Sequence, residues 1–194
     1  MDACTEGILT ATALMGFLYI CGVDLGLLLI RVVVGLLLVG HGTQKLFGWF
    51  GGSGIEKWAA GITSRGFVLP VLWAWAGALG ETVGGVLLFV GFLSPLGSLG
   101  IAGSMLVAMV TVHWSKGIWN SKGGIEFPLT NMVAALALAL TGPGVYSLDH
   151  LFGISLPTWF GWLAAVVVLG GATIGLLTRT PSAAPSPQPA TTAR

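Results

Sequence analysis

Long uncharged stretches constrain this chain more than any other feature. Only 8% of its 194 residues carry a charged side chain, whereas soluble domains have about 25%. A soluble fold with so few charges could not cover its surface with polar groups. Several apolar stretches approach the length of about 20 helical residues that is needed to cross a bilayer core of about 30 Å. The sequence therefore predicts an all-α membrane protein.

We expect five membrane-spanning helices. The fourth of them is the shortest, and Pro128 near its start suits the first turn of a helix, where a missing N–H is tolerated. The eight tryptophans mostly fall near the ends of the spans and are interpreted as interfacial anchors. The predicted spans are residues 25–44, 71–92, 96–113, 127–141 and 158–177.

The two ends of the chain differ from this pattern. Residues 8–23 are apolar but short and contain Thr10 and Thr12, so they could form an interfacial helix, a sixth span or the apolar part of a signal peptide. No Lys or Arg precedes this stretch, which argues against a signal peptide. We favour an interfacial or partly inserted segment over residues 1–23. Residues 179–194 are rich in Pro, Ala, Ser and Thr and are expected to be disordered.

The basic residues predict how the chain is oriented. With five spans, the side on which the first span ends receives every Lys and Arg outside the apolar runs, and the other side receives only Asp, Glu and His. Cytoplasmic loops carry the excess of Lys and Arg, so the N-terminus is expected outside and the C-terminal tail in the cytoplasm. The net charge of +1 and the lack of a basic patch exclude a nucleic-acid-binding surface. The residues on the basic side are Lys45, Lys57, Arg65, Lys116, Lys122, Arg179 and Arg194.

Ionisable residues inside the apolar runs are the first candidates for function. A central Arg or Asp costs roughly 2.5–3.5 kcal/mol in a bilayer and usually faces a bundle interior or a polar cavity. Arg31, His41 and Lys45 share one face of the first span at 100° per residue, and Glu81 lies near the middle of the second. The helical rise places Arg31 and Glu81 at similar depths, so we expect an ion pair between them. Such a pair could be purely structural or part of a site.

A second polar cluster is predicted near the basic side of the membrane, where residues from three spans reach a similar level. Imidazoles titrate near neutrality and could move protons to or from a ligand at the membrane surface. A quinone head group needs such donors beside an apolar slot for its tail. Two histidines and one glutamate without tight spacing are a weak metal signature, so no metal site is assigned. The catalytic candidates are Glu81, His41 and His113, and the ligand-binding candidates are Arg31, Lys45, Glu126 and Asn131.

Four motifs, in chain order, resemble those of the DoxX family of small bacterial membrane proteins. Each is weak alone, but their order over residues 24–152 is more specific. Two of them fall on the first and second spans, and the others fall on the third span with its following loop and on the turn after the fourth. They are Arg31-x3-Gly35 with His41-Gly42-x2-Lys45-Leu46-Phe47-Gly48, Gly80-Glu81-x2-Gly84-Gly85, Thr111-Val112-His113 with Gly123-Gly124-x-Glu126, and Gly142-Pro143-Gly144-x-Tyr146-Ser147-Leu148-Asp149.

The resemblance implies a four-helix transmembrane bundle over residues 24–152 in a bacterial plasma membrane. This chain adds a fifth transmembrane helix within residues 153–178, followed by the tail of residues 179–194. Relatives of this type include DoxD-type subunits of thiosulfate:quinone oxidoreductase. They also include DoxX proteins that join a superoxide dismutase and a sulfurtransferase in a membrane complex. The resemblance thus implies an association with quinone-linked redox chemistry.

Two functions from different classes stay open at this point. The first is a membrane subunit that binds a quinone and handles its protons. The sequence has no haem, iron–sulfur or nucleotide-binding motif, so electrons would come from a soluble redox enzyme or from a larger membrane complex. The second is a non-catalytic protein, either a scaffold that docks soluble redox enzymes or a carrier of a small solute or lipid. The sequence does not decide whether the protein is an enzyme.

Overall fold

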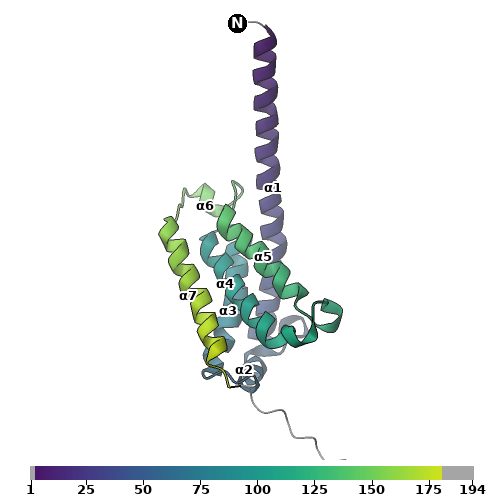
Figure 1. Ribbon diagram of the computed structural model, residues 1–194, viewed down its shortest axis with the longest axis vertical. Helices are drawn as coiled ribbons and strands as arrows, with labels where there is room; N and C mark the ends of the chain where they lie inside the picture. The colour runs from purple at the N-terminus through teal and green to yellow at the C-terminus, as the bar shows by residue number, and fades with distance from the viewer. Residues whose placement is uncertain (1–2, 181–194) are drawn as a thin grey trace, which may run out of the picture.

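The computed structural model describes the backbone of residues 3–180 and the side chains of residues 22–180, and this part of the chain is helical without strands (Figure 1). The predicted all-α fold is confirmed. Short helical turns η1 to η4 join the longer helices, and η2 (Met109–His113) is a π-helical turn that continues α4. The α-helices are α1 (Ala3–Phe47), α2 (Gly54–Ser64), α3 (Pro70–Val90), α4 (Ser94–Ala108), α5 (Glu126–Thr141), α6 (Leu148–Leu151) and α7 (Thr158–Leu177).

Within the described residues, four helical segments are long and apolar enough to cross a membrane. They are Gly22–Phe47, Pro70–Val90, Ser94–Lys116 and Thr158–Leu177. They coincide with four of the five predicted spans. The remaining predicted span is α5, an apolar helix of 16 residues that falls short of the usual spanning length.

The helices form a bundle in which each long helix packs on its neighbour. The main contacts join α1 to α3, α3 to α4, and α4 to both α5 and α7. Helices in lipid pack through small residues that let their backbones approach. Along α1 and α3, Gly35 lies against Phe89, Gly85 against Val39, and Gly42 against Thr82. These contacts advance along α1 and go back along α3 by equal numbers of residues, as antiparallel helices require, so they fix the register of the two helices.

This register overturns the predicted ion pair between Arg31 and Glu81. The next step beyond the Gly42–Thr82 contact places Glu81 level with Thr43, which is twelve residues from Arg31, or about 18 Å at 1.5 Å per residue. The depth estimate failed because it put the ends of both spans in the same membrane planes. The glycine contacts instead shift α1 along α3, and Lys45 takes the place that was predicted for Arg31.

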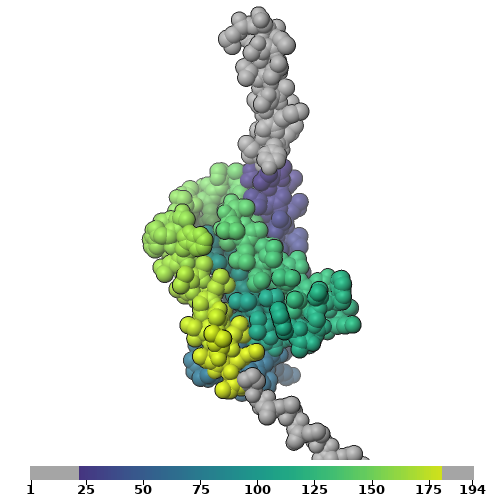
Figure 2. All heavy atoms as spheres, viewed as in Figure 1, coloured from purple at the N-terminus to yellow at the C-terminus, as the bar shows by residue number. Residues whose placement is uncertain are grey.

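The two ends of the bundle are built differently. At one end, α2 and the start of α3 meet the end of α7, where the Thr180 backbone N–H donates to the Gly66 carbonyl at 2.9 Å. At the other end lie α6 and the loop before it (Figure 1). Figure 2 shows α7 along one edge of the visible face, with α5 and the loop before it on the other side. The bundle thus has α7 packed on its outside, beside α4.

The structure tests the two predictions about the chain termini only in part. Residues 8–23, which the sequence left open, belong to α1, which runs without a break from Ala3 to Phe47. Their position relative to the bilayer surface stays a prediction. The tail that was expected to be disordered lies outside the described residues, apart from the first two positions of 179–194. The proposed division of the chain into segments also stays a prediction.

Candidate functional site

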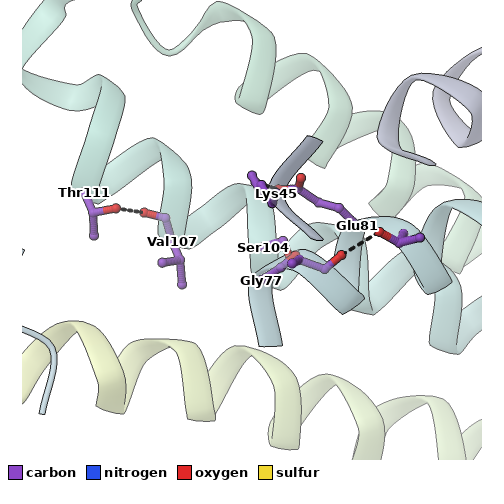
Figure 3. A network of polar contacts seen from close by, with 8 residues as sticks. Lys45, Gly77, Glu81, Ser104, Val107 and Thr111 are labelled. Atoms are coloured by element: carbon purple, nitrogen blue, oxygen red, sulfur yellow. Dashed lines mark hydrogen bonds and ion pairs between the residues drawn. The ribbon is translucent and has the colours of Figure 1, made fainter. Parts of the chain in front are cut away.

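A cavity of about 290 Å³ lies between α2, α3, α4 and α7, with one residue of α1 at its edge. Its wall is mostly glycine, alanine and valine, with two tryptophan rings. Figure 3 shows Lys45, Gly77, Glu81 and Ser104 close together, with Val107 and Thr111 further along. The polar and aromatic residues of the wall are Lys45, Glu81, Ser104, Thr111, Trp58 and Trp73.

Lys45 and Glu81 form the ionic centre of this cavity. The Lys45 ammonium from α1 pairs with Oε1 of Glu81 on α3. The Glu81 side chain is 1% exposed, whereas that of Lys45 is 17% exposed. The same ammonium lies 4.6 Å from the centroid of the Trp58 ring on α2, which is close enough for a cation–π contact. The pair therefore ties three helices together at one corner of the cavity.

Two polar atoms in the wall of the cavity lack a partner among the described residues. They are Oε2 of Glu81, an acceptor, and Nε1 of Trp58, a donor. Buried polar groups in proteins are nearly always hydrogen-bonded, and leaving one unpaired costs about 1–3 kcal/mol. A ligand that offers both a hydroxyl and an oxygen acceptor would satisfy both atoms. The cavity is therefore suited to a small polar group in apolar surroundings.

Glycines keep the space open. A Cβ added at Gly77 on α3 or at Gly171 on α7 would meet no atom within 4 Å, although both residues line the cavity. One turn along α3, the situation reverses, because a Cβ at Gly80 would come within 3.2 Å of the Gly100 carbonyl on α4. Gly80 thus serves close packing of α3 on α4, whereas Gly77 and Gly171 leave room beside that contact.

Four of the remaining candidates lie around the start of α5, and none of them lines the cavity. The ring of His41 packs on that of Phe127 with centroids 4.7 Å apart. His113 Nδ1 lies 2.6 Å from the Gly123 carbonyl. The structure thus brings these residues near the start of α5, but each of them contacts a neighbouring ring or backbone group and not the cavity. Asn131 donates to the Phe127 carbonyl at 2.8 Å, and Glu126, which is exposed, accepts from the Asn120 N–H at 2.9 Å.

Arg31 lies at the opposite end of the bundle, with 1% of its surface exposed. Its two terminal nitrogens donate to the backbone carbonyls of Pro143 and Tyr146. Asp149 from the same region caps the start of α4, accepting from the N–H and hydroxyl of Ser94 at 3.0 and 2.8 Å. Arg31 therefore fastens the loop after α5 to α1, and it does not line the Lys45–Glu81 cavity.

Comparison with known proteins shows the family of this chain. The DoxX family model matches residues 26–114. Over 130 residues, the chain is 32% identical to the inner membrane protein YqjF of Escherichia coli (strain K12), which covers 66% of this chain and 92% of that protein. The chain belongs to the DoxX family. It is also 30% identical to "Putative oxidoreductase CatD" of Bacillus subtilis (strain 168) over 126 residues, which is 65% of this chain and 86% of CatD. No solved structure matches the chain.

The DoxX match confirms the resemblance seen in the sequence and covers the ionic centre. Lys45 and Glu81 both lie within the matched residues, whereas α7 begins 44 positions after residue 114, where the match ends. This DoxX protein is a multi-pass membrane protein, and its relative YqjF is named as an inner membrane protein. One wall of the cavity therefore comes from a helix outside the region that the family model describes.

Sequence reasoning missed two aromatic residues of this site. Trp58 and Trp73 were interpreted as interfacial anchors, yet both line the cavity. Trp58 lies on α2, which connects the first two spans and was not predicted as a helix of its own. A signal was present in the spacing, because Trp58 and Ile62 are four residues apart and share one face of a helix. Ile62 is buried and also lines the cavity.

Proposed function

We propose that this DoxX protein is a membrane subunit associated with quinone-linked redox chemistry, and that it binds a quinone head group beside the Lys45–Glu81 pair. The observation that carries the proposal is the second carboxylate oxygen of Glu81, which is buried in the wall of a cavity and has no hydrogen-bond partner among the described residues. The relative CatD carries the name "Putative oxidoreductase CatD", which agrees with a redox setting.

The residues present fit such a head group. A quinone in its reduced form carries two hydroxyl groups on opposite sides of a flat apolar ring. Glu81 Oε2 can accept from a hydroxyl, while the Lys45 ammonium and Trp58 Nε1 can donate to an oxygen. The glycines and valines of the wall offer an apolar slot for the ring. The volume of about 290 Å³ is at the lower end of the range for ligand pockets, so it suits a head group without a long tail.

In this proposal, the chain supplies binding, orientation and proton exchange. Glu81 holds the polar edge of the ligand, and Lys45, which is partly exposed, links the cavity to the basic side of the bundle. A bound quinone supplies the capacity to take up two electrons and two protons. The electrons would come from a separate redox protein. His41 and His113 line no part of the cavity, so the proposal gives them no contact with the ligand.

Two glutamates provide a matched test. Glu81→Gln removes the buried negative charge and replaces one of its two acceptor oxygens with an NH₂ donor, whereas Glu126→Gln changes an exposed carboxylate outside the cavity. We expect quinone to co-purify with the wild-type protein and with Glu126→Gln, as measured by lipid extraction and chromatography. Glu81→Gln should bind ubiquinone-1 at least ten times more weakly, because a hydrogen bond to a charged group contributes about 1.5–3 kcal/mol. Quinone-free wild-type protein that still folds, or equal binding by both variants, would favour a scaffold or carrier.

We also propose that the N-terminus lies outside and the C-terminal tail in the cytoplasm of a bacterium. The end of α1, all of α2 and the end of α7 meet at one end of the bundle, which carries Lys45, Lys57 and Arg65. The exposed residues Lys57 and His150 mark the two ends. After replacement of the native cysteines, a membrane-impermeant maleimide should label His150→Cys in intact spheroplasts and Lys57→Cys only after permeabilisation. The reverse pattern would invert the topology.

A further inference from the structure

The wall of the Lys45–Glu81 cavity is exposed at two residues. Of the residues that line it, only Ala76 on α3 and Val167 on α7 are exposed, and the others are buried or half-buried. These two residues stand on the two helices that border one side of the cavity. They mark its mouth as the seam between α3 and α7.

The mouth lies at the depth of the lipid tails. Val167, which is 63% exposed, is nine residues from the start of α7 and ten from its end. At 1.5 Å per residue, these separations are about 14 and 15 Å along the helix. The middle of a membrane-spanning helix faces hydrocarbon, because the apolar core of a bilayer is about 30 Å thick. The exposed edge of the cavity therefore meets acyl chains and not water.

Towards the water-facing end, the same seam is closed. Gly175 lies eight residues beyond Val167, and it is packed so tightly on the ring of Trp73 that an added Cβ would overlap the ring. The hydrogen bond from Thr180 to Gly66 lies just beyond this contact. A molecule dissolved in water would have to displace the Trp73 ring to use this route.

The neighbouring seam between α4 and α7 is also closed near its centre. Gly103 on α4 is buried against Val168 on α7, and a Cβ added at Gly103 would overlap the valine side chain. Val168 is next to Val167, so α7 turns one valine into its contact with α4 and the other towards the outside. The α3–α7 seam is therefore the better route at this depth.

We infer that the ligand of this cavity is a lipid-dissolved, uncharged molecule that enters sideways from the bilayer between α3 and α7. The inference rests on the proposed binding at the Lys45–Glu81 pair and adds the ligand's source and route. Lys45 and Glu81 neutralise each other, so the cavity offers no net charge to a free ion. The polar head fits within about 290 Å³, and its apolar tail stays in the seam.

Two adjacent valines of α7 test the route. Val167 and Val166 are both exposed, at 63% and 69%, but only Val167 lines the cavity. Val167→Trp should narrow the mouth, whereas Val166→Trp adds the same bulk outside it. In stopped-flow measurements, ubiquinone-2 in phosphatidylcholine vesicles would quench the tryptophan fluorescence of the protein. We expect Val167→Trp to slow association about tenfold, while Val166→Trp stays within twofold of the wild type. Equal rates for both variants, with binding still lost in Glu81→Gln, would refute the route and leave the proposed function standing.

A second measurement does not depend on quinone binding. A nitroxide attached at Gly171→Cys, in a chain with Cys4 and Cys21 replaced by Ser, would report from the cavity wall. Because the cavity meets the bilayer, collisions with oxygen should relax the nitroxide more strongly than collisions with water-soluble nickel-EDDA. Stronger relaxation by nickel-EDDA would show a water-filled cavity and overturn the inference, whether or not the protein binds quinone.

Discussion

Removal of Lys45 should show how strongly the buried ion pair stabilises the protein. Glu81 is 1% exposed, and its second oxygen already lacks a partner within the part of the chain that the structure describes. In Lys45→Met, the carboxylate would lose the cation with which it pairs and could not reach water. Breaking a buried pair by removing one member costs about 3–5 kcal/mol. We expect the free energy of unfolding of Lys45→Met to fall by about this amount.

The opposite change should cost less, because the two partners differ in exposure. In Glu81→Gln, the Lys45 side chain is still 17% exposed and keeps its position 4.6 Å from the Trp58 ring. The ammonium can therefore stay partly hydrated, and we expect a loss of about 1–3 kcal/mol. The double variant with Met at 45 and Gln at 81 leaves no charged side chain in the cavity wall. It should be more stable than Lys45→Met alone, although it carries one more substitution.

Reversible unfolding in mixed detergent micelles with increasing sodium dodecyl sulfate, followed by circular dichroism, would measure these free energies. Lys57→Met is the matched control, because Lys57 is an exposed lysine of α2 outside the pair. The reasoning is refuted if Lys45→Met unfolds at the same detergent fraction as Lys57→Met. It is also refuted if the losses of the two single variants simply add in the double variant, since coupled partners must deviate from additivity.

Two further predictions concern the packing and the end of the bundle. Gly42→Val should lower the free energy of unfolding by about 1–3 kcal/mol, because its Cβ would overlap Thr82. Gly40→Val should cost less than 1 kcal/mol, since a Cβ there meets nothing within 4 Å; equal losses in detergent unfolding would contradict the register argument. Asp149→Ala should cost about 1.5–3 kcal/mol, because the buried carboxylate caps α4 through the Ser94 N–H and hydroxyl. Its loss should also speed hydrogen exchange at the Ser94 amide, and unchanged exchange would show that the cap is dispensable.

The helices could be predicted from the sequence because apolar length is a local property. The second span was predicted as residues 71–92 and is found at Pro70–Val90, and the last was predicted and found at Thr158–Leu177. The segment before α3 was less accessible to this reasoning. Helix α2 is too short and too mixed in polarity to span a membrane, so no length argument finds it.

The partner of Glu81 could not be predicted in the same way. The periodicity of α1 correctly placed Arg31 and Lys45 on one face, but the choice between them depends on how α1 slides along α3. Contacts at Gly35 and Gly42 decide that, and the spacing within one helix says nothing about them. The cavity is still harder to foresee, because it arises where Gly77 and Gly171 of separate helices leave space between them.

Arg31 and Glu81, the two most buried charged side chains among the described residues, differ in their surroundings. Both are 1% exposed. The two terminal nitrogens of Arg31 donate to carbonyls of the loop after α5. Its third nitrogen, Nε, has no partner among the described residues, but Arg31 does not line the Lys45–Glu81 cavity. One carboxylate oxygen of Glu81 pairs with Lys45, and the other has no partner among the described residues, although Glu81 lies in the wall of a cavity. The unpaired oxygen destabilises the protein by about 1–3 kcal/mol, and a ligand that donates a hydrogen bond to it would remove this penalty. Of the two, only Glu81 lines the cavity, and for this reason the Lys45 end of the bundle is the place to look for the ligand.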